Sequence, residues 1–228
     1  MNPFVSRAGG KLDHALRAFG LDVHGLACAD FGCNAGGFTD CLLRRGAARV
    51  HAVDTGYGAL AWTLRNDPRV VVMERTNALH APPPEGGVDL VVVDLGWTPQ
   101  RLAVPAALRW LRAGGRIVSL VKPHYEASSR GGSPHRGGLS ADDSNAVLAR
   151  VVEEFPALGV RVAGIVESPL VGAKSSRKGA GNREFLALLV RSADPGGEPL
   201  PEASQDALRQ VLANSPKARQ EAPGSGGN

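Results

Sequence analysis

The sequence has 228 residues, of which 43% are hydrophobic and 21% charged, as in ordinary globular domains. No run of about eighteen apolar residues occurs and the first residues lack the apolar core of a signal peptide, so we expect a cytoplasmic protein that does not enter a membrane. The 26 Lys and Arg against 22 Asp and Glu leave a small positive excess, which permits a polyanionic partner without requiring one.

The first half of the chain alternates between helical and strand patterns. Apolar residues at helical spacing predict a helix at Gly10–Phe19. Further helices are predicted at Phe38–Arg45, Ala59–Leu64 and Val104–Arg112, and strands at Leu26–Phe31, Arg49–Asp54, Arg69–Glu74 and Val88–Leu95. The last of these strands is almost entirely apolar, as expected of a central parallel strand buried on both faces. Pro105 is expected in the first turn of its helix, where proline is tolerated.

The second half continues this alternation. The predicted elements are a strand at Arg116–Val121, a mobile loop at Pro123–Gly138, a helix at Asp142–Phe155, and strands at Val160–Val166 and Glu184–Val190 on either side of a loop at Gly172–Gly181. No helical pattern joins the last two strands, so we expect a hairpin with one antiparallel strand.

These elements predict an α/β fold: a doubly wound, Rossmann-like, mostly parallel seven-stranded sheet with one antiparallel strand near the C-terminus. We expect the domain to occupy residues 1–191. Residues 192–228 are rich in Pro, Gly, Ser and Glu, and we expect them to be disordered apart from a short helix at Ser204–Leu212.

The stretch ADFGCNAGGFTD, residues 29–40, predicts a strand, a glycine turn and a helix whose N-terminus faces a ligand. Asp30 precedes Gly32 and the pair Gly36–Gly37; a carboxylate there would repel a pyrophosphate but suits a cofactor with an ammonium group and a sulfonium. S-adenosylmethionine (SAM) is such a cofactor, and Asp54, at the end of the next strand, would accept hydrogen bonds from its ribose. The alternative is a mere tight strand–helix connection.

The three cysteines lie close together in the sequence, but they form no C-x-x-C pair and no histidine stands at a ligand interval nearby. We predict no metal site. Cys28 and Cys41 are interpreted as small apolar core residues, whereas Cys33, in the glycine turn, could be exposed.

Asp94 and Lys122 stand where two neighbouring apolar strands end, so we expect them to approach each other beside the cofactor. The alternative is an ion pair that only closes the strand ends. A hydroxyl needs a base before it can be methylated at neutral pH, and a lysine acts as a base only when burial or a second cation favours its neutral form. Lys11 could supply that cation and Glu184 could balance it, a hypothesis that sequence positions alone do not test.

The motifs VSRAGGKL, DFGCNAGGFTDCLL, AVDTGYGALAWTLRNDPRV, VDLVVVDL, LVKPHYE and GNREFL, in this order, resemble those of TlyA-type proteins within the FtsJ-like group. The resemblance implies a Rossmann-like class I methyltransferase that transfers methyl from SAM to a ribose 2'-hydroxyl of RNA, with ribosomal RNA the expected partner. It also implies a catalytic Lys-Asp-Lys-Glu tetrad of Lys11, Asp94, Lys122 and Glu184, with Lys122 as the central base. The cofactor-binding residues expected on this basis are Asp30, Gly32, Gly36, Gly37, Phe38, Asp54, Asn77 and Asp94.

Two features depart from the family pattern. TlyA-type proteins usually carry a small RNA-binding domain ahead of the catalytic one, whereas this chain begins almost directly at its first motif, so we expect the catalytic domain without it. The segment RGGLSADDSN also lacks the family's usual valine–arginine–aspartate run, so substrate contacts there are expected to differ.

The expected RNA contacts are basic and aromatic residues around the active site. The basic candidates are Arg7, Arg130, Arg136, Lys174, Arg177 and Lys178, each of which could instead belong to a solvated loop. Trp97 and Tyr125 are expected either to stack on an unpaired base or to pack in the core, and Trp62 to pack against the cofactor-side helix. Two other functions stay open: O-methylation of a small molecule or protein, and a catalytically silent RNA-binding module.

Overall fold

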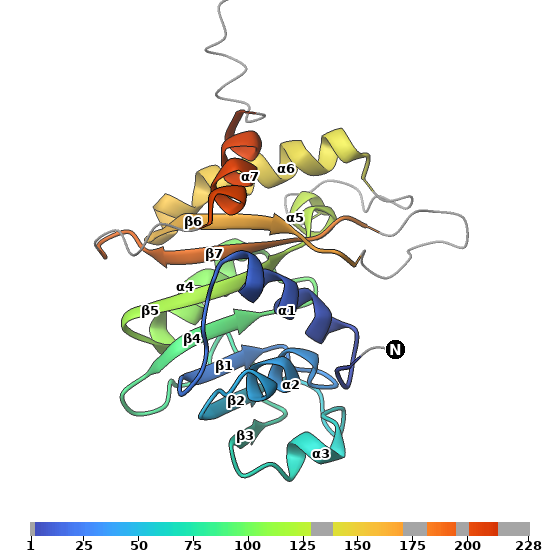
Figure 1. Cartoon of the computed structure of the whole chain (residues 1–228), viewed down its shortest axis with the longest axis vertical. Helices are drawn as coiled ribbons and strands as arrows, with labels where there is room; N and C mark the ends of the chain where they lie inside the picture. Colours follow the sequence, from blue (N-terminus) through green and yellow to red (C-terminus); the bar gives the residue numbers. More distant parts are fainter. Residues whose placement is uncertain (1–2, 129–138, 171–181, 195–200, 214–228) are drawn as a thin grey trace, which may run out of the picture.

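The strands of the chain assemble into one twisted sheet. The computed structural model describes residues 3–128, 139–170, 182–194 and 201–213. Within these residues the strands are β1 (Ala27–Phe31), β2 (Arg49–Val53), β3 (Val70–Met73), β4 (Val88–Val93), β5 (Leu111–Val121), β6 (Val160–Glu167) and β7 (Phe185–Arg191). They lie in the order β3-β2-β1-β4-β5-β7-β6 (Figure 1).

The pairing confirms the predicted topology. The pairs β1–β2, β1–β4, β2–β3 and β4–β5 are all parallel, and β7 is antiparallel to both β5 and β6. The strand order reverses beside β1, because the chain leaves the edge strand β3 and returns to form β4 on the other side. Such a reversal opens a crevice at the carboxyl ends of the strands, where ligands bind in folds of this class.

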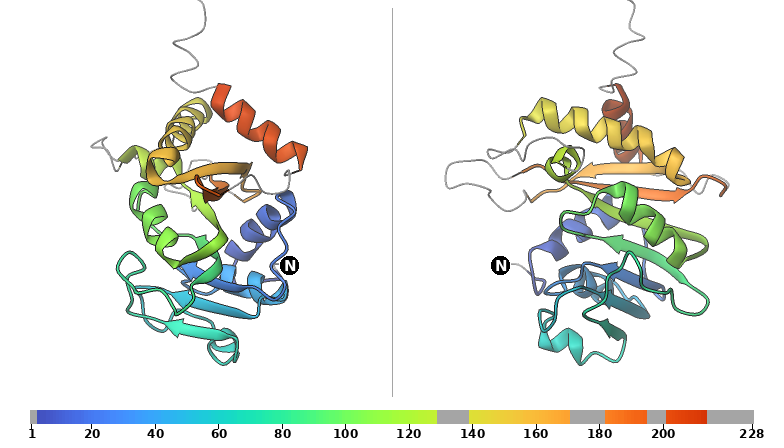
Figure 2. Two further views of the ribbon diagram at one scale, coloured as in Figure 1. Left: turned by 90° about the vertical axis from the view of Figure 1, so that its left-hand side faces the viewer. Right: turned by 180° about the vertical axis from the view of Figure 1, so that it is seen from behind.

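Helices cover both faces of the sheet (Figure 2). They are α1 (Ala8–Ala18), α2 (Gly37–Arg44), α3 (Trp62–Arg65), α4 (Gln100–Trp110), α5 (Pro123–Ser128), α6 (Ala141–Glu154), the 3-10 turn η1 (Phe155–Leu158) and α7 (Glu202–Ala213). Side chains of β4 alternate between the two cores: Leu90 and Val92 pack with α1 and α2, whereas Val91 and Val93 pack with α4 and α6. A strand buried on both faces has to be apolar throughout, as the VDLVVV sequence is.

Two local predictions were wrong. Helix α4 begins at Gln100 rather than Val104, so Pro105 lies inside the helix, where it cannot donate a hydrogen bond to the carbonyl of Arg101. The segment after β5 was predicted as a mobile loop from Pro123, but Pro123–Ser128 forms α5, in which proline takes the first position. Residues 129–138 of that predicted loop lie outside the described residues.

The C-terminal helix is longer than predicted and belongs to the packed structure. Helix α7 runs from Glu202 to Ala213, and one of its faces contacts the core. The Ser204 hydroxyl is buried and donates a hydrogen bond of 2.7 Å to the carbonyl of Ala18 at the end of α1. Packing therefore continues beyond residue 191; residues 195–200 and 214–228 lie outside the described residues. In the described part of the chain, no helix has the length and apolar character needed to span a membrane.

Candidate active site

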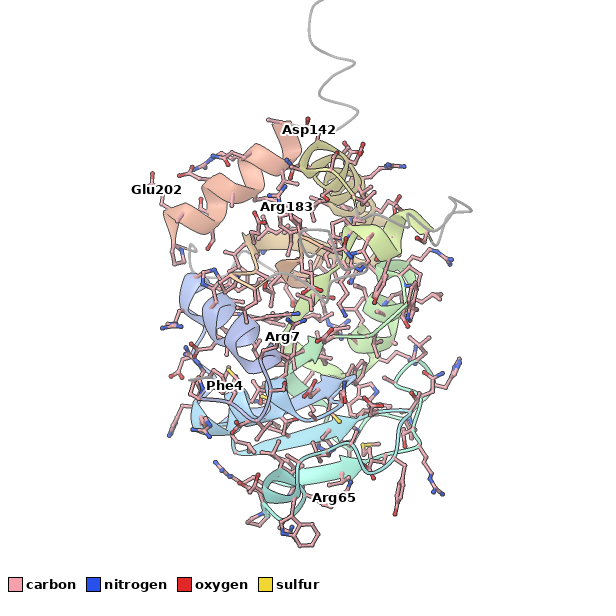
Figure 3. The ribbon with its side chains drawn as sticks, turned by 90° about the vertical axis from the view of Figure 1, so that its right-hand side faces the viewer. Phe4, Arg7, Arg65, Asp142, Arg183 and Glu202 are labelled. Carbon is pink, nitrogen blue, oxygen red and sulfur yellow. The ribbon has the colours of Figure 1, made fainter. Side chains whose placement is uncertain are left out.

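A cavity of about 1090 Å³ opens along the carboxyl ends of the central strands. Gly32, Asp54, Asp94 and Lys122, which follow β1, β2, β4 and β5 respectively, all line it. The beginning of α1 forms another part of the wall. There Arg7 is exposed and lines the cavity. Figure 3 labels Arg7 near the middle of the molecule, where α1 begins. The cavity thus occupies the crevice expected from the reversal in strand order.

Asp94 and Lys122 form an ion pair inside this cavity. The Lys122 Nζ atom lies 2.5 Å from Asp94 Oδ1, and the two side chains are 12% and 21% exposed. The pair forms because β4 and β5 are adjacent and parallel, with Val93 opposite Ser119, so their carboxyl ends leave the sheet side by side. The Lys122 ammonium also lies 5.5 Å from the centre of the Tyr125 ring. The predicted proximity of Asp94 and Lys122 is therefore confirmed.

Lys11 and Glu184 form a second ion pair in the same cavity wall. The Lys11 Nζ atom lies 2.5 Å from Glu184 Oε2, and the side chains are only 7% and 5% exposed. Lys11 comes from α1, whereas Glu184 directly precedes β7. A buried ion pair is a costly feature, because both charges lose their hydration. The structure thus brings all four residues of the expected tetrad to one cavity, as two ion pairs.

Asp30 is fully buried, and only one of its two carboxylate oxygens has hydrogen-bond partners among the described residues. Its Oδ2 atom accepts hydrogen bonds from the Thr39 backbone N–H (2.9 Å) and the Thr39 hydroxyl (2.7 Å). Among the described residues, Oδ1 has no hydrogen-bond partner. Burial raises the pKa of Asp30 to about 7; the Thr39 bonds oppose the rise and the Asp94 and Asp54 carboxylates add to it. A smaller cavity of about 90 Å³, also lined by Asp94, lies against Asp30, so a cationic ligand group could satisfy the open oxygen.

The raised pKa makes stability depend on pH. The unfolded carboxyl ionises near 3.8 and the folded one near 7, so between these values the folded state holds more protons. The contribution of Asp30 to the free energy of unfolding is therefore fully present below about pH 4 and decreases, by up to about 4 kcal/mol, as the pH rises through 7. We expect Asp30→Asn to gain stability relative to the wild type across this range. Urea denaturation from pH 4.5 to 8 tests this, and parallel profiles for the two proteins would contradict it.

The glycines of the β1–α2 turn have different roles. Gly32 has a φ of +86°, and a Cβ there would lie 2.6 Å from the Asp94 carbonyl oxygen, so only glycine fits at this point of the cavity. A Cβ at Gly36 would collide with Leu64, and one at Gly37 with Ser6. Neither Gly36 nor Gly37 lines the large cavity or the small one beside Asp30. Their neighbours Ala35 and Phe38 line the small cavity, so a cofactor contact at the two glycines themselves stays a prediction.

The other expected cofactor residues lie at the cavities. The Asp54 carboxylate lines the large cavity and accepts hydrogen bonds from the backbone N–H groups of Asn34 (2.9 Å) and Gly56 (2.7 Å). Asn77 is exposed and lines the same cavity. Phe38 lines the small cavity, although most of its ring is buried in the core between α1, α2 and the sheet.

The three cysteines are free and buried, so the expectation that Cys33 could be exposed was wrong. Burial raises the pKa of each thiol, in the case of Cys28 and Cys41 to about 12. Thiols in this state are poor nucleophiles and poor metal ligands. Among the described residues, no group of three His, Cys, Asp or Glu side chains could hold a metal ion.

Trp97 and Trp62 are more exposed than core packing allows. Trp97 is 74% exposed, and its ring stacks on Tyr125 with centres 4.4 Å apart and planes at 28°. Both residues line the cavity, so for Trp97 the core interpretation was wrong. Trp62 is 75% exposed, which also contradicts its expected packing against a helix. Of the basic candidates, only Arg7 can be placed; Arg130, Arg136, Lys174, Arg177 and Lys178 lie outside the described residues.

His124 is a cavity residue that the sequence reasoning missed. Burial, together with the Lys122 ammonium, lowers the pKa of His124 to about 4, so the imidazole is neutral at physiological pH. Its Nδ1 atom is buried without a hydrogen-bond partner among the described residues, and its ring lies 4.2 Å from that of Tyr125. Its position two residues after Lys122 was the one signal available.

Comparison with known proteins agrees with this geometry. A family model described as FtsJ-like methyltransferase matches residues 4–185. The chain is 41% identical to the 16S/23S rRNA (cytidine-2'-O)-methyltransferase TlyA of Mycobacterium tuberculosis, over 93% of this chain and 77% of that protein. It is 35% identical to hemolysin A of Brachyspira hyodysenteriae, over 82% of this chain and 77% of that protein. A solved structure from Lactococcus lactis described as a hemolysin is 32% identical, with a TM-score of 0.76, over 90% of this chain and 98% of that one. The chain therefore belongs to the FtsJ-like methyltransferase family.

Proposed function

We propose that the protein transfers a methyl group from SAM to a ribose 2'-hydroxyl of ribosomal RNA. The observation that carries the proposal is the convergence of two lysine–carboxylate pairs, Lys122–Asp94 and Lys11–Glu184, on one cavity at the strand ends. The identity of 41% to a protein named as an rRNA (cytidine-2'-O)-methyltransferase supports the same acceptor. Ribosomal RNA as substrate would place the protein in the cytoplasm.

The residues around the cavity fit SAM. The open Oδ1 atom of Asp30 offers a buried acceptor for a cationic group, and Gly32 lines both cavities beside it with backbone atoms alone. Asp54 would accept hydrogen bonds from the ribose of the cofactor, and Asn77 would lie near its adenine. When bound, SAM supplies an electrophilic methyl carbon attached to a sulfonium.

The chain's own residues would prepare the acceptor hydroxyl. In its neutral form the Lys122 amine accepts the proton of the 2'-hydroxyl, while Asp94, 2.5 Å from the Lys122 nitrogen, fixes where that amine points. Glu184 holds the Lys11 ammonium in the cavity wall, with Lys11 Nζ 2.5 Å from Glu184 Oε2. This pairing keeps Lys11 from replacing Lys122 as the partner of Asp94.

Exposed side chains at the cavity would hold the RNA. The stacked rings of Trp97 and Tyr125 offer a flat surface for an unpaired base, because every base has an aromatic face. Arg7, exposed at the cavity, would contact a phosphate. An assembled ribosomal subunit and free ribosomal RNA are both candidate substrates.

The class of acceptor is the direct test of this function. The protein would be incubated with methyl-labelled SAM and, separately, with ribosomal RNA, ribosomal subunits, a ribosome-free protein extract and a small-metabolite pool. We expect label in RNA, either free or in the subunit. Label confined to protein or metabolites would indicate a different O-methyltransferase, and SAM binding without transfer to any fraction would indicate a silent RNA-binding module.

A further inference from the structure

Three buried polar side chains connect the two strand ends that carry Asp94 and Lys122. They are Ser119, Gln100 and Glu126, with exposed fractions of 0%, 5% and 4%. The Ser119 hydroxyl donates to Gln100 Oε1 (2.6 Å), the Gln100 amide donates to the carbonyl of Leu120 (3.3 Å), and the Gln100 backbone N–H donates to Glu126 Oε1 (2.8 Å). We call these three residues the Gln100 network.

The Gln100 network joins residues that flank Asp94 and Lys122. Ser119 stands opposite Val93, the residue before Asp94, and both Ser119 and Glu126 lie close to Lys122 in the sequence. Gln100 is the first residue of α4, at the end of the segment that begins with Asp94. The network therefore connects the segment 94–100 with the segment 119–126, and each of these segments contributes one member of the ion pair.

The segment between Asp94 and Gln100 is under backbone strain. Trp97 has a φ of +57°, a left-handed conformation that a bulky side chain rarely adopts. Such strain persists only where surrounding contacts impose it. Pro99, the residue before α4, provides no side-chain cap, and the carboxylate of Glu126 receives the N–H of Gln100 instead. The side chain of the strained residue is also held in place, because the Trp97 ring stacks on Tyr125 of α5.

Building on the proposed function, we propose that Ser119, Gln100 and Glu126 are positioning residues of the methyl transfer. Apolar side chains could fill the same space, but they would not fix the orientation of the two segments, whereas buried hydrogen bonds have narrow geometric requirements. The Gln100 network thereby holds Asp94 against Lys122 and keeps Trp97 over Tyr125. It contacts neither cavity in the described structure and acts only through these residues.

Replacing both hydrogen-bonding side chains separates positioning from stability. Gln100→Met and Ser119→Ala each leave a buried polar group without its partner, so each variant should lose both stability and kcat. In the double variant both partners are apolar, which restores most of the stability. If the residues position the ion pair, kcat of the double variant stays low, down by about 10²-fold as for small misplacements of catalytic groups. Recovery of kcat together with stability would overturn the proposal.

A second pair of variants tests the contact of Glu126 with Gln100. Glu126→Ala removes the acceptor of the Gln100 N–H and should lower kcat, whereas Glu126→Gln keeps an oxygen there and should restore most of the activity. Equal activity of these two variants would overturn the role of Glu126. In all variants the SAM dissociation constant should change far less than kcat. Ile165→Val, in the buried part of β6, is the control: it lowers stability without affecting kcat.

An NMR measurement tests the geometry independently of activity. The indole N–H signal of Trp97, assigned from its loss in Trp97→Phe, should shift or broaden in the Ser119→Ala/Gln100→Met double variant, because Trp97 no longer stays stacked on Tyr125. An unchanged signal would overturn the proposal. If the wild type transferred no methyl to RNA, the proposed function would fail, and this measurement would still decide whether the Gln100 network sets the position of Trp97.

Discussion

Replacing Lys122 by methionine is expected to reduce methyl transfer to RNA by about 10²–10⁴-fold, the range that removal of a general base produces. Methionine keeps the length of the side chain but cannot accept the proton of the 2'-hydroxyl. The SAM affinity should persist, because Asp30, Gly32 and Asp54 remain in place around the cavity. Single-turnover methylation with saturating SAM, combined with calorimetric titration of SAM on the same preparations, measures the two effects separately.

An arginine at this position distinguishes base chemistry from charge. Lys122→Arg can keep an ion pair with Asp94, but the guanidinium stays protonated and cannot accept a proton. We therefore expect Lys122→Arg to be as inactive as Lys122→Met. Substantial activity of Lys122→Arg would assign Lys122 an electrostatic role instead. Arg209→Met on α7, where the arginine pairs at the surface with Asp206, controls for the loss of a positive charge.

Breaking the second ion pair should affect both stability and activity. In Lys11→Met the Glu184 carboxylate stays buried without its cation, and losing one member of a buried pair lowers the free energy of unfolding by about 3–5 kcal/mol. The pair is 2.5 Å long and more than nine-tenths buried, so solvent can compensate little of the loss. Denaturation in urea would measure the change, and methyl transfer at a temperature where the variant remains folded would measure the activity.

The double variant Lys11→Met/Glu184→Met separates these two effects. With both charges replaced by apolar groups, most of the stability should return, because no uncompensated charge remains buried. Methyl transfer should nevertheless stay low, because two of the four charged groups of the proposed tetrad are missing from the cavity wall. A double variant as active as the wild type would show that Lys11 and Glu184 serve only the packing of α1 against the start of β7.

The sequence predicted the site where its signals are local. Asp30, Asp54, Asp94 and Lys122 each follow an apolar run, and the ends of parallel strands meet at one edge of a sheet, so strand order alone brings these side chains together. The antiparallel strand was predicted from another local signal: no helical pattern separates the last two strands, so they were expected to form a hairpin.

Other features depend on contacts between distant segments. Lys11 and Glu184 are 173 residues apart, so sequence positions suggested their pairing only as a hypothesis, which the family resemblance then implied. A glycine pattern does not reveal which neighbour fills the space of the missing side chain: Leu64 does so at Gly36 and Ser6 at Gly37. The solvent exposure of a side chain also depends on distant parts of the chain. Trp62 was predicted to pack but faces solvent, because no element of the described structure covers it.

Buried polar residues were the hardest to recognise. Ser119 reads as one polar residue in an apolar strand and Gln100 as part of a loop, so neither pattern indicates that they bond each other. The start of α4 was misplaced for the same reason. Its first N–H group is satisfied by Glu126 from α5 and not by a neighbouring side chain, so no local capping signal marks the start of the helix.

Alkaline hydrolysis of labelled RNA examines the chemistry at the acceptor oxygen itself. Strong base cleaves RNA through its 2'-hydroxyl groups, so a methylated 2'-oxygen protects the bond that follows it. If two lysines and two carboxylates around one cavity activate a ribose hydroxyl, the transferred label should appear in alkali-resistant dinucleotides, and Lys122→Met should give none. Label released entirely in mononucleotides would mean that a base atom accepts the methyl group and would contradict this account.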